Sequence, residues 1–159
     1  SRILEVYLDD VYELLAEGNK EQAAKNLDRA YGWASISQLP TDSCWMKFIM
    51  YYSYLDPKHE KAVEIAREFA DVLVSEYMDL TKTYETIYSS YVSAYKRYQM
   101  TDSDEDLDLL LEYKDVLENL ENVIYNLEIY MDQLQDSAAA MDLMDVVSKL
   151  QECSGALDE

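Results

Sequence analysis

Apolar and tyrosine residues recur at alternating steps of three and four between Pro57 and Met100, and no further glycine or proline interrupts them. This alternation predicts one long helix with a continuous apolar seam. An unbroken helix of this length would be about 65 Å long. Polar and β-branched residues at Thr81-Lys82-Thr83 mark a place where it could kink or break. The expected seam residues are Val63, Ala66, Ala70, Leu73, Tyr77, Leu80, Tyr84, Ile87, Tyr91, Ala94 and Tyr98.

A second seam with the same alternation follows, after a connector at residues 101–103. Ser103 and Asp106 have the spacing of a capping box, and acidic residues are favoured in a first helical turn. Two long seams joined by a short connector predict an antiparallel coiled-coil hairpin. A break is expected near Asp136-Ser137, before a short last helix. The second seam comprises Leu110, Tyr113, Leu117, Leu120, Ile124, Leu127, Met131, Leu134, Ala138 and Met141.

Two shorter helices are predicted at the start of the chain. The first, over residues 2–17, ends at Gly18, a residue that commonly terminates helices. Asn19 followed by Gln22 fits the N-cap of the second helix, which Pro40 ends. The short junction predicts an antiparallel helical hairpin. The first helix is expected to face inward with Leu4, Tyr7, Leu8, Val11, Leu14 and Leu15.

Residues 44–55 are apolar on every side of a predicted third helix, so we expect that helix to be buried all round. Asp56 before Pro57 then fits an N-cap followed by proline at the first position of the long helix.

The hairpin carries a pattern of small and aromatic residues that ends in Arg29-Ala30-Tyr31-Gly32-Trp33-Ala34. Over about the first 36 residues this pattern resembles the helical hairpin of an archaeal domain of unknown function, number three-five-seven in that series. The resemblance implies a helical hairpin and no particular activity. Its residues are Tyr7, Asp10, Leu14, Leu15, Gly18, Ala23, Leu27, Ala30, Gly32 and Trp33.

These patterns together predict an all-α fold, a bundle of about five to six helices built on a long antiparallel coiled-coil-like hairpin. The 159 residues fit a single domain. Within it we expect residues 1–56 to form the N-terminal hairpin and the buried third helix. Residues 57–150 would form the long hairpin and the short last helix.

The chain has a formal net charge of −20, and its last third carries most of that charge. Residues 101–159 contain 17 acidic and 2 basic residues, a net charge of −15. Such a surface repels nucleic-acid phosphates and anionic lipids and attracts basic proteins. It also keeps a protein soluble, and adaptation to a salty cytoplasm would produce it too. We expect no direct nucleic-acid or membrane binding, and a cytoplasmic location.

The residues needed for catalysis or for a cofactor are not grouped in the sequence. The one histidine, His59, stands at the start of a helix and is interpreted as exposed or capping rather than catalytic. Cys44 and Cys153 lack the clustering of a zinc or redox site. We therefore predict no catalytic, cofactor-binding or metal-binding residues and a protein that is not an enzyme.

The function predicted from the sequence is an interaction or scaffold module for a protein partner, and the acidic charge makes a basic partner one option. Two other functions stay open, namely an inhibitor that mimics nucleic acid and a small-ligand carrier with a tyrosine-lined cavity. A homo-oligomer is also open, because a seam can pair between chains. The candidate interaction residues are two tyrosines off the seam and an acidic set expected to point outward: Tyr88, Tyr95, Glu112, Asp115, Glu118, Glu121, Glu128 and Asp132.

Overall fold

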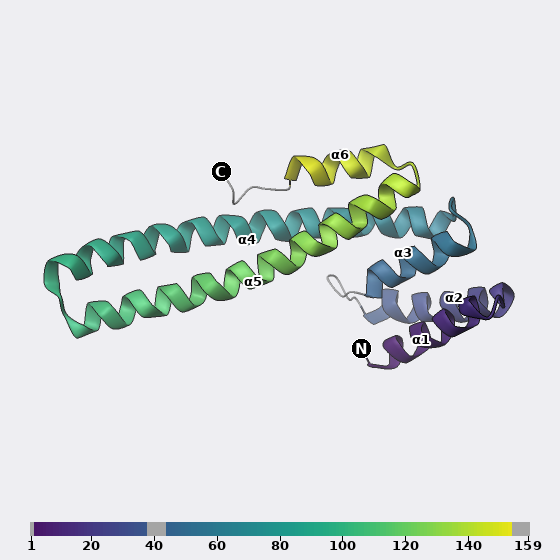
Figure 1. Cartoon of the computed structure of the whole chain (residues 1–159), viewed down its shortest axis with the longest axis horizontal. Helices are drawn as coiled ribbons and strands as arrows, with labels where there is room; N and C mark the ends of the chain where they lie inside the picture. The colour runs from purple at the N-terminus through teal and green to yellow at the C-terminus, as the bar shows by residue number, and fades with distance from the viewer. Residues whose placement is uncertain (1, 38–43, 154–159) are drawn as a thin grey trace. The chain divides into compact units, whose positions relative to one another are not determined.

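The computed structural model describes residues 2–37 and 44–153, and these residues form an all-α structure (Figure 1). No strand occurs within those two ranges. The predicted fold class is therefore confirmed. The predicted helix end at Pro40 lies outside the described residues, as does Thr41-Asp42-Ser43, which the sequence predicts to cap the third helix. The helices are α1 (Arg2–Ala16), α2 (Lys20–Ser37), α3 (Cys44–Leu55), α4 (Glu60–Thr101), α5 (Asp104–Ala140) and α6 (Met144–Cys153).

The chain divides into two compact units, and the division falls inside the two longest helices. The first, here called the core unit, comprises Ser1–Val74 and Tyr130–Glu152. The second comprises Ser75–Ile129 and Cys153–Glu159, and its helical part is here called the hairpin unit. The internal boundary predicted from the sequence lies at residue 56, between the N-terminal part of the chain and the long hairpin. That the chain is one domain stays a prediction.

The junction between α1 and α2 follows the predicted pattern. Gly18 has a φ of 80°, and the amide of Asn19 donates to the carbonyl of Leu14 over 2.9 Å. This arrangement satisfies carbonyls at the end of α1. The side chain of Asn19 then accepts a hydrogen bond from the amide of Gln22 over 3.3 Å, as expected of an N-cap.

In the core unit α4 is buried over a wide face, because several helices surround it. Ala62, Ile65 and Phe69 are buried there in addition to the seam residues Ala66, Ala70 and Leu73. In the hairpin unit α4 lies beside α5, which runs antiparallel to it (Figure 1). There Leu80, Tyr84, Ile87, Tyr91 and Tyr98 are only half-buried. The second predicted seam, which lies on α5 except for Met141, is confirmed, since all its members are buried except the half-buried Tyr113 and Leu120.

Three predicted boundaries need correction. The helix α4 begins at Glu60 and not at Pro57, because Asp56 caps a turn over residues 56–59 instead of the helix. It then runs unbroken past residues 81–83, where the hydroxyls of Thr81 and Thr83 bond to carbonyls of the preceding turn. The break expected at residues 136–137 lies at 141–143, where Asp142 adopts a φ of 62°.

The prediction that α3 is buried all round is wrong. Phe48, Ile49 and Tyr52 are buried, but Met50 and Tyr54 are more than half exposed. Tyrosine and methionine raise the apolar count of a helix without requiring burial, since one has a polar tip and the other is common at adaptable surfaces.

Candidate functional site

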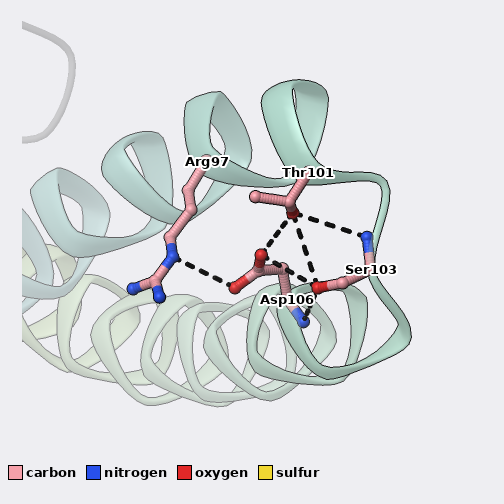
Figure 2. A network of polar contacts seen from close by, with 4 residues as sticks. All are labelled: Arg97, Thr101, Ser103 and Asp106. Carbon is pink, nitrogen blue, oxygen red and sulfur yellow. Dashed lines mark hydrogen bonds and ion pairs between the residues drawn. The ribbon is translucent and has the colours of Figure 1, made fainter.

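The candidate site lies in the hairpin unit, where α4 and α5 are joined by a turn of two residues. Ser103 caps α5, because its hydroxyl accepts a hydrogen bond from the amide of Asp106 over 3.1 Å. The carboxylate of Asp106 accepts hydrogen bonds from the hydroxyls of Ser103 and Thr101 (Figure 2). It also pairs with Arg97 over 3.3 Å. These hydrogen bonds, with Arg97, lower the pKa of Asp106. The network joins the end of α4 to the start of α5.

Two tyrosines of the α4 seam bond to glutamates of α5. The hydroxyl of Tyr77 donates to Glu128 over 3.2 Å, and that of Tyr84 donates to Glu121 over 2.7 Å. The second hydrogen bond raises the pKa of Tyr84 to about 12, because losing the phenol proton would place two anions together. Both tyrosines therefore stabilise the pairing of the two helices.

The predicted tyrosines Tyr88 and Tyr95 are 50% and 45% exposed. The ring of Tyr88 stacks between those of Tyr84 and Tyr91, with centroids 6.3 Å apart on each side. Stacking of this kind holds a ring in place along the helix. Tyr88 therefore combines an exposed edge with contacts inside its own helix.

The predicted acidic residues do not form one outward stripe. Glu112, Asp115, Glu118 and Asp132 are exposed. Glu121 is also exposed, but it accepts the hydrogen bond from Tyr84. The half-buried Glu128 accepts that from Tyr77, so both glutamates lie at the edge of α5 that faces α4. Consecutive steps of three residues each fall about 60° short of a full helical turn, so such a series winds around the helix.

An apolar stripe that is not among the residues predicted from the sequence lies on the other flank of the α5 seam. Leu109, Val116 and Val123 recur at steps of seven and are 37%, 42% and 47% exposed. Val116 lies five residues before Glu121, and Val123 lies five residues before Glu128. This spacing places the valines about 140° from the glutamates around the helix. Leu110, Leu117 and Ile124 of the seam recur at the same spacing of seven, one position after each stripe residue. The sequence alone therefore does not separate the stripe from the seam.

The core unit has a second exposed feature, a groove between α1 and α3 of about 280 Å³. Tyr12 and Tyr54 are exposed at its rim, and Lys20 lies 5.5 Å from the centre of the Tyr54 ring. The groove is not predicted from the sequence, because the apolar composition of α3 indicates a helix that is buried all round. Its lining comprises Tyr12, Leu15, Ala16, Met50, Tyr51 and Tyr54.

His59 has a structural role in the core unit. Its Nδ1 accepts a hydrogen bond from the amide of Lys61 over 3.1 Å, which makes it the N-cap of α4. Its ring lies 4.6 Å from that of Tyr52. A nitrogen engaged as a cap is not available as a general base.

A polar cluster lies beside His59. Tyr52 and Lys61 both donate to the same oxygen of Asp28 over 2.7 Å. Burial opposes ionisation of Asp28, but the hydrogen bonds from Lys61 and Tyr52 outweigh it and lower the pKa of this carboxyl. The cluster connects α2, α3 and α4 through hydrogen bonds, and its geometry suits a structural role.

Within residues 2–37 and 44–153, no group of three or more histidine, cysteine or acidic side chains is arranged to hold a metal ion. No described helix has an apolar stretch long enough to cross a membrane. Comparison of the chain with protein-family models, curated proteins and solved structures gives no match.

Proposed function

We propose that this protein is a non-enzymatic interaction module that binds a basic protein partner on the exposed face of α5. The observation that supports this proposal is the charge of that helix in the hairpin unit. Residues 104–129 contain 9 acidic residues and 1 basic residue, Lys114. Such an imbalance creates a negative field that steers a positively charged partner toward the surface.

Few of these carboxylates are neutralised inside the hairpin unit. Asp106 pairs with Arg97, while Glu112, Asp115 and Glu118 are exposed. A basic partner would reduce the repulsion among them, which is a gain that a neutral partner does not offer.

This surface suits a partner that has both basic and apolar side chains. It suits less well the groove of a nucleic-acid-binding protein, which a nucleic-acid mimic would occupy. Exposed apolar side chains at Leu109, Val116 and Val123 interrupt the carboxylates. A mimic of the phosphate backbone requires charge, and it gains little from an apolar stripe in the polar groove of a nucleic-acid-binding protein.

The test is fluorescence anisotropy with a labelled lysine-rich helical peptide at several salt concentrations. In one variant Asp108, Glu112, Asp115 and Glu118 are replaced by their amides. The matched control neutralises four exposed residues of α1, namely Glu5, Asp9, Asp10 and Glu13, so that both variants have the same net charge.

We expect the α5 variant to bind at least fivefold more weakly than the wild type, and the α1 variant to bind nearly as well as the wild type. Exposed charge pairs contribute about 0.2–1 kcal/mol each, which is consistent with a loss of this size for four. An equal loss in both variants would mean that the peptide responds only to net charge, and the proposal would fail.

A further inference from the structure

The apolar stripe of α5 is longer than its three exposed members. Leu109, Tyr113, Val116, Leu120 and Val123 follow one another at steps of four, three, four and three. Tyr113 and Leu120 also belong to the seam facing α4, and both are only half-buried. The helix therefore carries two heptad patterns that share these two positions.

One heptad pattern is enough to pair two helices. An a/d seam covers two of every seven positions, whereas helices that face two neighbours carry a third apolar position beside it. In the hairpin unit α5 is paired with α4, whose Tyr77 and Tyr84 donate hydrogen bonds to its glutamates. The third position is filled by Leu109, Val116 and Val123, which remain exposed.

Isolated apolar residues on a surface require no explanation. These three differ because their spacing of seven places them in line over about 21 Å of helix, which is about four helical turns. A helix of a partner that lies along α5 could place one apolar side chain per turn between them.

The charge beside the stripe indicates which kind of helix this is. Glu105 and Glu112 each lie one helical turn from Leu109, and Glu112 also lies one turn from Val116. All of the acidic residues at this edge are exposed. A second copy of α5 would bring more carboxylates to this edge, whereas lysine or arginine beside the apolar stripe of a partner would pair with them.

We propose that the stripe formed by Leu109, Val116 and Val123 is the docking site for a basic amphipathic α-helix of a partner protein. The helix of the partner contributes leucine-like side chains in a heptad repeat, and it carries lysine or arginine beside them. This inference rests on the proposed function, because it specifies the form of the basic partner.

The experiment uses the whole chain and three labelled synthetic peptides of about 18 residues. The first has leucine in a heptad repeat with lysine on the flanking positions. The second has the same composition in a scrambled order with no apolar face, and the third keeps the leucine repeat but replaces lysine with glutamine. Dissociation constants are measured at two salt concentrations.

Two protein variants localise the binding. Val116→Ser with Val123→Ser removes apolar side chains from the stripe. Leu111→Ser with Tyr125→Ser is the matched control, because these residues are 48% and 62% exposed on the same helix but lie off the stripe. Circular dichroism before each titration verifies that both variants are helical.

We expect the amphipathic lysine peptide to bind at least tenfold more tightly than either of the other two. The stripe variant should bind it at least tenfold more weakly than the wild type, while the control variant should change its affinity less than threefold.

Two results would overturn this inference and leave the proposed function standing. Equal binding of the amphipathic and scrambled lysine peptides would mean that charge alone attracts the partner. Equal losses in the two protein variants would place the contact away from the stripe. If no lysine peptide binds, the proposed function fails as well.

Self-association is checked by light scattering of the unbound protein. A dimer that dissociates when Val116 and Val123 are replaced by serine would show that a second copy covers the stripe. That result would also overturn the assignment to a basic helix.

Discussion

Single side chains decide where the elements of this protein begin and how they are held, and His59 is an example. Its Nδ1 caps α4 while its ring lies against Tyr52. Replacing it with alanine should cost about 1 kcal/mol of unfolding free energy, because the amide of Lys61 loses its acceptor.

His59→Asn is the matched variant, because asparagine is among the best N-cap residues. We expect urea unfolding to show that His59→Asn retains more stability than His59→Ala. Equal losses in both variants would assign the effect to the ring contact with Tyr52 instead of the cap.

Tyr84 makes the free energy of unfolding depend on pH. Its pKa is raised to about 12 in the folded protein, mainly by the hydrogen bond to Glu121, from an ordinary value of about 10. The stabilisation from this bond is therefore complete below about pH 10 and disappears as the pH rises through 12.

The stability difference between the wild type and Tyr84→Phe should accordingly shrink between pH 10 and pH 12. Chemical denaturation at a series of pH values measures it. A difference that stays constant over this range would show that the hydroxyl does not hold Glu121.

At the scale of elements, the turn between α4 and α5 allows two substitutions with opposite effects. Asp102 has a φ of 49°, a conformation that glycine adopts without strain. Asp102→Gly should raise the unfolding free energy by up to about 1 kcal/mol. Ser103→Ala should lower it by about 1 kcal/mol, because α5 loses its cap.

Thermal unfolding of the two variants beside the wild type tests this pair. A gain from Ser103→Ala, or a loss from Asp102→Gly, would contradict the description of the turn.

The sequence contains enough information to predict some of these elements but not others. Gly18, Asn19 and Ser103 were assigned correctly because each has a local role at a helix end. The predicted start of α4 is too early because Asp56 and Pro57 also suit an isolated turn, and aspartate is a more common N-cap than histidine.

Surfaces were harder to predict than seams. A seam has a period, and the period of α5 identified its buried residues. The exposure of Met50 and Tyr54 depends instead on which side of α3 other helices cover, and that is a tertiary property. The stripe at Leu109, Val116 and Val123 was overlooked for a related reason, since an apolar residue next to a seam belongs to the core only if a further helix covers it.

For the whole molecule, charge is the property that dominates behaviour in solution. The acidic side chains that give the chain its net charge of −20 repel one another in the compact state, and added salt screens that repulsion. We expect the midpoint of thermal unfolding to rise between about 0.02 and 0.5 M sodium chloride, where the Debye length falls well below 10 Å.

Replacing Asp108, Glu112, Asp115 and Glu118 with their amides should reduce this dependence on salt. A midpoint that falls with salt would contradict the expectation. It would mean that exposed ion pairs, such as Arg67 with Asp145, outweigh the repulsion.

In the proposed complex a basic helix lies along the exposed apolar stripe of α5. Chemical-shift mapping by NMR, with the amphipathic lysine peptide added to labelled protein, locates the bound helix residue by residue. We predict that the largest changes occur at Leu109, Val116 and Val123, with little change at Leu111 and Tyr125. Changes concentrated at Tyr12, Met50 and Tyr54 in the groove of the core unit, or spread evenly over the acidic residues, would contradict the claim.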